Sequence, residues 1–461
     1  MPGRAVLLNP PGPEIYLRDY FCSKVSKADY CDHPLDLLML SGTLSRRYEV
    51  HLIDGIAERL SAGAALRRLH RLRPTVVVFQ AGAASWATDR PFLERAKAVT
   101  GALMIGIGDL LYGRGEEMLR ALPWLDAVLY DFSSEAVLSV ATGDGGPLEN
   151  VVYRHGGAIV GGPAARTRGE IAPALPRHDL FVHRRYAFPF VRRTPFATFL
   201  SEYGCLYRCP FCINGLLGYK PRRLGNVAAE LDLLAGMGVR DLWIRDQTFG
   251  ARPARGAALC DLLGRRRFGW VCYSRVDVLT DRLIRRMHRN GCHTIMMGVE
   301  SGDDDVLRRY KRGLTRARVR EVFALCRRHG VRTVASFMIG FPEEGPEQVE
   351  RTIDLAVSIG CDFASFNLVV PRAGTSLRDA ALAQGLIGAD EVVVDQSGTR
   401  PAMATRQLDR QALAAWRRRA ERRFYLRPGY VMRRLSALRS PEEAAPLLRN
   451  GLAVLRRVLR R

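Results

Sequence analysis

The chain has 461 residues, of which 47% are hydrophobic, and it carries a formal net charge of +23. This length and apolar content exclude a small or disordered protein and predict at least two domains. Ten scattered cysteines do not form a disulfide framework of the secreted type, and no apolar run reaches the ~20 residues that span a bilayer. Residues 1–13 lack the pattern of a signal peptide, so we expect a cytoplasmic protein.

The first 145 residues alternate short apolar runs with helical patterns, which is typical of an α/β domain. Buried parallel strands are predicted at residues 5–9, 50–54, 76–80, 103–106 and 127–131, and helices include 34–47 and 89–100. This order predicts a doubly wound, Rossmann-like domain over residues 1–145, with its ligand crevice beyond the carboxyl ends of the strands. Residues 146–195 are rich in Gly, Pro and Arg and lose this rhythm, so we interpret them as a linker.

A second α/β unit is predicted over residues 196–380. Its strands are expected at residues 198–200, 242–244, 271–273, 294–298, 334–339 and 364–370. Helix ends are marked by glycines, which accept the left-handed conformation, at Gly238, Gly291, Gly330 and Gly360. Thr280 and Thr315 stand where helix N-caps are expected. These repeated units predict a partial (β/α)6 barrel with its chemistry at the carboxyl ends of the strands.

Residues 381–461 form a basic region that is predicted to be mostly helical. From Arg410 to Arg461, fifteen arginines face three acidic residues, a net charge of +12. Such a segment can contact an anionic membrane, bind nucleic acid or stay solvated, and the arginine bias of a GC-rich genome gives the same charge without function. Residues 452–457 have the pattern of an amphipathic surface helix, which favours peripheral contact with the inner face of a membrane over nucleic acid.

Three cysteines with the spacing C-x3-C-x2-C, Cys205, Cys209 and Cys212, follow the first predicted barrel strand. Three thiolates on one tight loop can bind three irons of a 4Fe-4S cluster and leave the fourth iron open to a substrate or cofactor. A structural zinc site is the alternative, but it requires four ligands, usually in two separated pairs, and no second pair follows. The spacing therefore favours a catalytic iron-sulfur cluster.

With Phe211 directly before the third cysteine, this loop resembles the signature of radical S-adenosylmethionine (SAM) enzymes. The resemblance implies a radical SAM barrel in which the open iron binds the amino and carboxylate groups of SAM. Reduction of the cluster, by a donor such as flavodoxin or ferredoxin, then cleaves SAM to a 5′-deoxyadenosyl radical. The need for reduced thiols agrees with a cytoplasmic protein.

The resemblance also implies SAM-binding roles for residues at the strand ends. Asp246 is expected to accept a hydrogen bond from the ammonium group, Arg275 to pair with the carboxylate and Ser274 to add a hydroxyl contact. The structural alternatives are a capping role for Asp246 and an ion pair between Arg275 and Glu300.

The later strands complete this expected site. Glu300, within a sequence at residues 298–302 that resembles a family motif, is expected to accept from the ribose hydroxyls. The turn at Gly340 lets the backbone approach the adenine, or is a turn without a ligand. Phe211 and Asn214 are expected beside the adenine.

A doubly wound domain before such a barrel resembles the cobalamin-binding branch of the superfamily, which includes methyltransferases and the anaerobic cyclase of chlorophyll synthesis. The resemblance covers most of the chain, including residues 33–38 and 422–428. The common cobalamin signature D-x-H-x-x-G is absent, because Asp32 and His33 are adjacent, and the expected glycine-rich loop is only partly matched at residues 106–108. Cobalamin, beside the cluster and SAM, is therefore an open expectation.

These observations favour a radical SAM enzyme that modifies an unactivated carbon of a small-molecule substrate. If cobalamin binds, we expect methyl transfer; if not, a rearrangement, cyclisation or oxidation. One alternative is methylthio transfer to RNA, but that class adds three cysteines before the barrel and only Cys22 and Cys31 precede it here. Another is a non-catalytic iron-sulfur accessory protein at a membrane. A lipid-like substrate would suit the basic region, and a natural-product intermediate is the other expected substrate.

Overall fold

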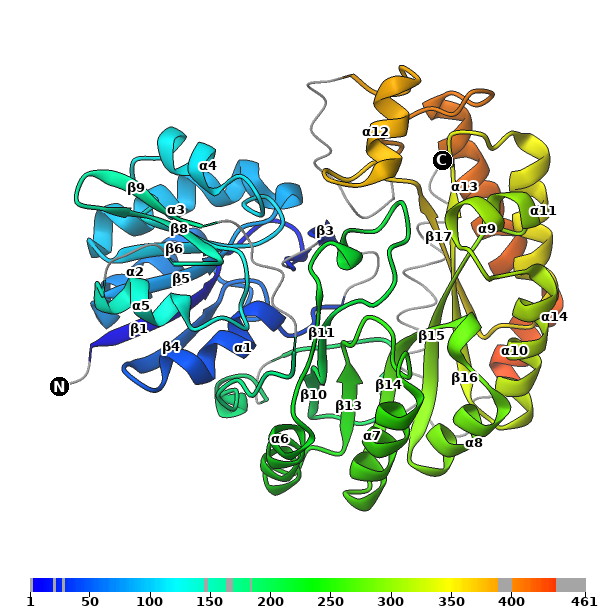
Figure 1. The fold of residues 1–461 in the computed structure, drawn as a ribbon, viewed down its shortest axis with the longest axis horizontal. Helices are drawn as coiled ribbons and strands as arrows, with labels where there is room; N and C mark the ends of the chain where they lie inside the picture. Colours follow the sequence, from blue (N-terminus) through cyan, green and yellow to red (C-terminus); the bar gives the residue numbers. More distant parts are fainter. Residues whose placement is uncertain are drawn as a thin grey trace.

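A computed structural model describes residues 3–19, 22–26, 30–144, 148–162, 169–182, 185–388 and 400–436. Two α/β units lie side by side, the N-terminal one in blue and cyan and the C-terminal one in green to orange (Figure 1). The α/β fold class predicted from the sequence, a Rossmann-like unit followed by a six-stranded barrel, is confirmed.

The N-terminal unit is a seven-stranded sheet in the order β4-β1-β5-β6-β7-β8-β9. The predicted strands are all present, as β1 (Arg4–Asn9), β4 (Glu49–Asp54), β5 (Val76–Gln80), β6 (Leu103–Ile107) and β7 (Ala127–Leu129). They pair in parallel, and the chain reverses direction across the sheet between β1 and β5, which is the topological switch point. The helices are α1 (Leu35–Leu44), α2 (Ala62–Leu72), α3 (Trp86–Thr100), α4 (Gly115–Ala121) and α5 (Ala136–Thr142).

The interpretation of residues 146–195 as a linker is wrong for residues 151–162. These residues form the antiparallel hairpin of β8 (Val151–His155) and β9 (Ala158–Gly162), which extends the sheet beside β7. Val151 and Tyr153 alternate into the core, and Gly157 takes a φ of +79° at the turn. The hairpin forms because apolar residues alternate on both sides of a Gly-Gly turn. A prediction that looks for strands followed by helices does not detect such a hairpin.

A short hairpin between β1 and α1 was not predicted. It consists of β2 (Tyr16–Leu17) and β3 (Lys24–Val25). The backbone N–H and hydroxyl of Ser23 donate to Asp109 at 2.7 and 2.9 Å, which ties the hairpin to the loop after β6. Figure 1 shows β3 between the two units, so this hairpin contributes residues to the seam between them.

The C-terminal unit is a six-stranded parallel sheet whose strands follow chain order. They are β10 (Phe196–Phe199), β13 (Asp241–Ile244), β14 (Gly269–Arg275), β15 (Cys292–Glu300), β16 (Arg332–Ile339) and β17 (Phe363–Leu368). The intervening helices are α6 (Leu224–Gly236), α7 (Pro253–Arg265), α8 (Asp281–Arg289), α9 (Asp304–Tyr310), α10 (Arg316–Arg328) and α11 (Pro346–Ser358). Since β10 and β17 remain the two edges, the barrel is partial, as predicted.

Local signals for helix ends hold in the structure. The hydroxyl of Thr280 accepts from the backbone of Leu283, and Thr315 caps α10 in the same way. Gly291 takes a φ of +93°, and a Cβ there would lie 2.0 Å from the carbonyl oxygen of Phe268. Only glycine fits that turn between α8 and β15.

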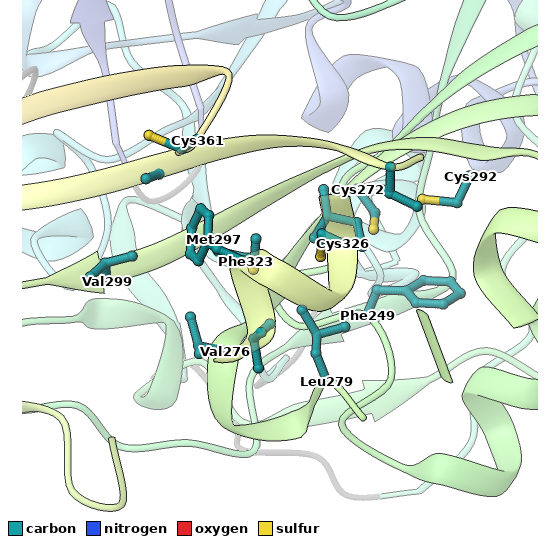
Figure 2. Packing of buried hydrophobic residues seen from close by; sticks show 14 of the residues in the cluster. Phe249, Cys272, Val276, Leu279, Cys292, Met297, Val299, Phe323, Cys326 and Cys361 are labelled. Atoms are coloured by element: carbon teal, nitrogen blue, oxygen red, sulfur yellow. The ribbon is translucent and has the colours of Figure 1, made fainter. Parts of the chain in front are cut away.

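The single cysteines of the barrel are small buried side chains of its apolar core. Figure 2 shows several of them among apolar side chains such as Phe249, Met297 and Phe323. The exposed fraction is 1% or less for Cys260, Cys272, Cys292, Cys326 and Cys361.

The described part of the basic C-terminal region packs on the barrel. Its helices are α12 (Ser376–Ala383), α13 (Arg410–Tyr425) and α14 (Pro428–Ser436). Leu413 and Phe424 of α13 are buried, and Arg417 forms a buried pair with Glu421. The predicted amphipathic segment at 452–457 lies outside the described residues. Among the described helices, none is long and apolar enough to cross a membrane.

Candidate active site

The three motif cysteines lie on the loop between β11 (Glu202–Gly204) and β12 (Tyr219–Pro221). This antiparallel pair closes the loop at its base, where the backbone N–H of Cys205 donates to Gly218 at 3.1 Å. All three cysteines are free and partly exposed. The loop therefore presents its thiols at the carboxyl end of β10.

The cysteines do not form a site for a single metal ion. In the described part of the chain, no three His, Cys, Asp or Glu side chains converge on one point that could hold an ion. Tetrahedral zinc requires such convergence, whereas each cysteine of an iron-sulfur cluster binds a different iron. The observation that favours a cluster is the placement of three free thiols on one loop with the C-x3-C-x2-C spacing.

Each sulfur has a hydrogen-bonding neighbour. Arg275 Nη1 lies 3.2 Å from the sulfur of Cys209, and Asn214 Nδ2 lies 3.5 Å from that of Cys212. The sulfur of Cys205 is 3.6 Å from the hydroxyl of Thr248. Burial raises the pKa of the Cys212 thiol, and these donors favour the thiolate form that binds iron.

Arg275 reaches the cluster loop, but its main partner is not the one considered from the sequence. Its guanidinium forms a bidentate pair with Asp277 at 2.9 and 2.7 Å and lies 3.9 Å from the ring centre of Tyr207. The alternative of an ion pair between Arg275 and Glu300 is wrong. Burial lowers the pKa of Arg275, but Asp277 and Cys209 outweigh it and hold the pKa above its ordinary value. A contact with the SAM carboxylate stays a prediction.

Asp246 binds the backbone just before the cysteine loop. It is fully buried and accepts hydrogen bonds from the backbone N–H groups of Ser201 and Glu202 at 2.6 and 3.0 Å, and from the Ser201 hydroxyl. It thus caps the start of the cysteine segment. Ser274 donates its hydroxyl to the carbonyl of Phe249 at 2.8 Å. For both residues the observed contacts are structural, and their contacts with SAM stay predictions.

Glu300 is paired with a residue that the sequence did not indicate. Lys311 Nζ lies 2.5 Å from its Oε1, and both side chains are buried. The backbone of Glu300 has a φ of +70°, an uncommon conformation for a non-glycine residue that is concentrated at functional sites. A Cβ at Gly298 would lie 2.2 Å from Glu300 Oε1, so glycine is needed there to admit this carboxylate.

The turn after β16 is built around Glu344. Its Oε2 accepts from the backbone N–H groups of Gly340 and Phe341 at 2.8 and 3.0 Å. Phe341 stacks on Tyr310 at 4.2 Å and meets Phe211 of the cysteine loop edge-on at 5.8 Å. The structure therefore brings Phe211 and the Gly340 turn together, as the adenine prediction requires.

Replacing Glu344 with glutamine is expected to flatten the pH dependence of stability. Burial raises the pKa of Glu344 to about 7, although the two backbone N–H groups oppose it. Between pH 4.5 and 7 the folded chain therefore holds a proton that the unfolded chain has released, so stability falls as pH rises. The variant should lose roughly 3 kcal/mol of this pH-dependent change, measured by urea unfolding of the anaerobic protein from pH 4 to 8. The exposed Glu347→Gln on the same helix is the control, and parallel curves for the two variants would contradict the assignment.

A buried charged cluster joins the two units at the mouth of the barrel. Arg245, directly after β13, pairs with Asp19 and with Asp32 Oδ2, the latter at 2.9 Å. Its guanidinium lies 4.4 Å from the ring centre of Trp243. Burial raises the pKa of Asp19 to about 6, although Arg245 opposes it. No sequence signal connects residues more than 200 positions apart, and sequence reasoning missed this cluster.

All ten predicted site residues lie on the C-terminal unit, at or near the carboxyl ends of its strands. Arg275 contacts Cys209, Asn214 contacts Cys212, and Phe211 meets the Gly340 turn through Phe341. Asp246 and Ser274 contact neighbouring backbone, and Glu300 contacts Lys311. Further residues that the sequence did not single out are Lys311, Glu344 and Asp277.

Comparison with known proteins agrees with this geometry. Residues 202–356 match the family model of the Radical SAM superfamily. The chain is 24% identical over 417 residues to an uncharacterised methyltransferase of Pyrococcus horikoshii, covering 87% of this chain and 89% of that protein.

Two solved structures share the fold. TsrM, a radical SAM methyltransferase from Kitasatospora setae solved with cobalamin and a 4Fe-4S cluster, has a TM-score of 0.63 at 20% identity and covers 85% of this chain and 77% of that one. OxsB, a cobalamin-dependent SAM radical enzyme, has a TM-score of 0.70 at 14% identity and covers 98% of this chain and 72% of that one. The matched family segment holds all ten predicted site residues. Residues 202–356 therefore form a Radical SAM domain, and the chain is an enzyme whose two-domain fold is shared with TsrM and OxsB.

Proposed function

We propose that this enzyme methylates an unactivated carbon of a small-molecule substrate. The observation that carries the proposal is the three-cysteine loop at the mouth of a partial barrel, facing a Rossmann-like unit across the charged seam of Arg245, Asp19 and Asp32. The near full-length relation to a protein named as a methyltransferase supports the reaction class.

Cys205, Cys209 and Cys212 would hold the 4Fe-4S cluster, with one iron left for SAM. When bound and reduced by one electron from a donor such as flavodoxin or ferredoxin, the cluster supplies cleavage of the C5′–S bond of SAM, giving methionine and a 5′-deoxyadenosyl radical that takes a hydrogen atom from the substrate. Arg275 and Asn214 would hold the sulfur atoms in hydrogen bonds, and Asp246 would fix the loop.

The N-terminal unit offers a place for cobalamin. Gln80 Oε1 at the end of β5 and Asp19 Oδ1 at the seam are buried acceptors with no hydrogen-bond partner among the described residues. The amide groups around a cobalamin ring carry N–H donors that suit such acceptors. The glycines at 106 and 108 do not support cobalamin binding, because close packing within the protein already requires small residues there. A Cβ at Gly108 would lie 2.0 Å from the carbonyl oxygen of Ala81. Bound cobalamin would relay the methyl group of a second SAM, which leaves S-adenosylhomocysteine.

The inner wall of the barrel indicates the chemistry of the substrate. Along β15 to β17 the side chains that face the helices are buried, whereas the inward ones, including Met296, Ser336, Met338, Ser365 and Asn367, are partly exposed. Asn367 Nδ2 donates to the Ser336 hydroxyl at 3.0 Å.

The five named residues are uncharged, whereas Arg332 lies on the same face of β16. At the rim, Glu300 pairs with Lys311 and Arg275 with Asp277, and Arg372 lies 3.4 Å from the sulfur of Cys22. A charged group packed against the five uncharged side chains would lose hydration without gaining a counterion from them. We therefore propose that the reacting part of the substrate is uncharged, apolar and equipped with a hydrogen-bonding group, as in a lipid-like or natural-product intermediate.

Anaerobic reconstitution tests the reaction. The protein is loaded with iron and sulfide, then incubated with SAM, reductant and cobalamin, and 5′-deoxyadenosine, S-adenosylhomocysteine and bound cobalamin are measured together. Both nucleoside products with bound cobalamin support methyl transfer. Deoxyadenosine alone, without cobalamin, would instead favour a rearrangement, cyclisation or oxidation. A protein that holds no iron and does not turn over SAM refutes the radical proposal and favours an accessory role.

We also propose peripheral membrane contact through the end of the described chain. Leu426, Val431 and Met432 are 44%, 42% and 70% exposed, and Arg427 and Arg433 stand among them. Exposed apolar residues with arginines suit an anionic lipid surface better than a nucleic acid groove. Flotation with phosphatidylglycerol liposomes checks this: wild type should float, and a Val431→Asp/Met432→Asp variant should not. Equal flotation of both removes the membrane role from this surface.

A further inference from the structure

Asn214 holds a buried hydrogen-bond acceptor that no described residue satisfies. It follows Cys212 in the short turn η3 (Ile213–Gly215), and only 8% of the residue is exposed. Its Nδ2 donates to Gln247 Oε1 at 2.9 Å and to the sulfur of Cys212 at 3.5 Å. Its Oδ1 has no donor within the described part of the chain. Buried acceptors are normally satisfied by a protein group, an ordered water or a ligand.

The two contacts decide which way the amide points. A thiolate that binds iron accepts hydrogen bonds and cannot donate them, so the nitrogen of Asn214 must face Cys212. Gln247, in the loop after β13, accepts from the same NH2 group. With both amide hydrogens engaged, Oδ1 is held on the opposite side of the group, where it can only accept.

We propose that Asn214 Oδ1 accepts a hydrogen bond from an N–H group of SAM, and that Gln247 is the positioning residue that holds the amide in this orientation. This inference rests on the proposed radical SAM function. SAM carries two nitrogen donors, the 6-amino group of its adenine and its α-ammonium group. Both require an acceptor, and a neutral amide supplies one without placing a second negative charge beside the cluster thiolates.

SAM affinity of the anaerobically reconstituted full-length protein tests the proposal. It is measured by equilibrium dialysis and by the change that SAM causes in the electron paramagnetic resonance spectrum of the reduced cluster. Asn214→Ala should weaken SAM binding roughly threefold to tenfold, because one hydrogen bond is lost. Gln247→Leu should also weaken it, whereas Gln247→Glu keeps an acceptor oxygen for the Asn214 amide and should bind SAM more tightly than Gln247→Leu.

The double variant separates direct from indirect action. Asn214→Ala/Gln247→Leu should bind SAM as tightly as Asn214→Ala alone, because Gln247 acts through Asn214. Additive losses would overturn the role of Gln247. Iron content of each variant confirms that the loop has folded, and if Asn214→Ala loses iron, the contrast between Gln247→Leu and Gln247→Glu carries the test.

Two analogues identify the donor. S-inosylhomocysteine lacks the 6-amino group, and methylthioadenosine lacks the amino acid. The analogue without the relevant donor should bind wild type and Asn214→Ala equally well.

If Asn214→Ala and Gln247→Leu both bind SAM with unchanged affinity, the inference is overturned. If the wild type holds iron but fails to bind SAM, the proposed function itself is overturned.

Discussion

Cys209→Ala is expected to abolish the formation of 5′-deoxyadenosine and to remove most of the bound iron. Cys209 is the middle ligand of the motif and the one whose sulfur contacts Arg275 at 3.2 Å. In this variant only two of the four irons would have a protein ligand, which is too few to retain the 4Fe-4S cluster. Iron and sulfide analysis, the visible spectrum and deoxyadenosine formation after anaerobic reconstitution measure the effect.

Cys326→Ala is the matched control for this change. Cys326 is 0% exposed in the apolar core of the barrel (Figure 2). Its replacement should leave iron content and SAM cleavage intact and cost only about 1 kcal/mol of stability, since a small buried side chain is truncated. A Cys209→Ala protein that keeps its iron and its turnover would show that the loop is not the cluster site.

Arg245→Met is expected to give the largest loss of stability among these variants. It leaves Asp19 and Asp32, both on the N-terminal unit, without the guanidinium that neutralises them at the seam. Removing one partner of a buried ion pair typically costs 3–5 kcal/mol, because the remaining charge is desolvated and uncompensated. Urea unfolding of the reconstituted protein, followed by circular dichroism and by proteolysis between the two units, measures the loss.

The loss should depend on pH in a defined direction. The pKa of Asp19 is about 6 with Arg245 present, and removing the cation raises it further. Protonation then relieves the uncompensated charge, so Arg245→Met should be closest to wild type near pH 5 and furthest from it above pH 7. Arg308→Met, which breaks a pair with side chains 75% and 83% exposed, should cost less than about 1 kcal/mol at any pH. Equal losses for the two variants would mean that the seam is not held by this pair.

The residues that sequence reasoning placed well depend on local pattern. The barrel strands, the caps at Thr280 and Thr315 and the turn at Gly291 follow from periodicity and from backbone preferences within a few residues. The hairpin at residues 151–162 was not predicted, because its two antiparallel strands have no helix between them and so lack the pattern of a βαβ unit.

Residue roles were harder to predict than residue positions. Asp246, Ser274 and Arg275 were placed correctly at strand ends, but their observed partners are Ser201, Phe249 and Asp277. A carboxylate at a strand end looks the same in sequence whether it contacts a ligand or caps a neighbouring segment. Only the strand packing decides which donors lie within reach of it.

The cysteine loop and the order of the strands around it can be predicted from the sequence, because both depend on spacing along a single segment. Four features become visible only in the folded chain: the pairing of Arg245 with Asp19 and Asp32, the pairing of Glu300 with Lys311, the raised pKa of Glu344 and the buried oxygen of Asn214 that no described residue contacts. Those features arise from burial and from contacts between distant segments. Desolvation and charge pairing act through space, and their strength is set by neighbours that no local pattern specifies.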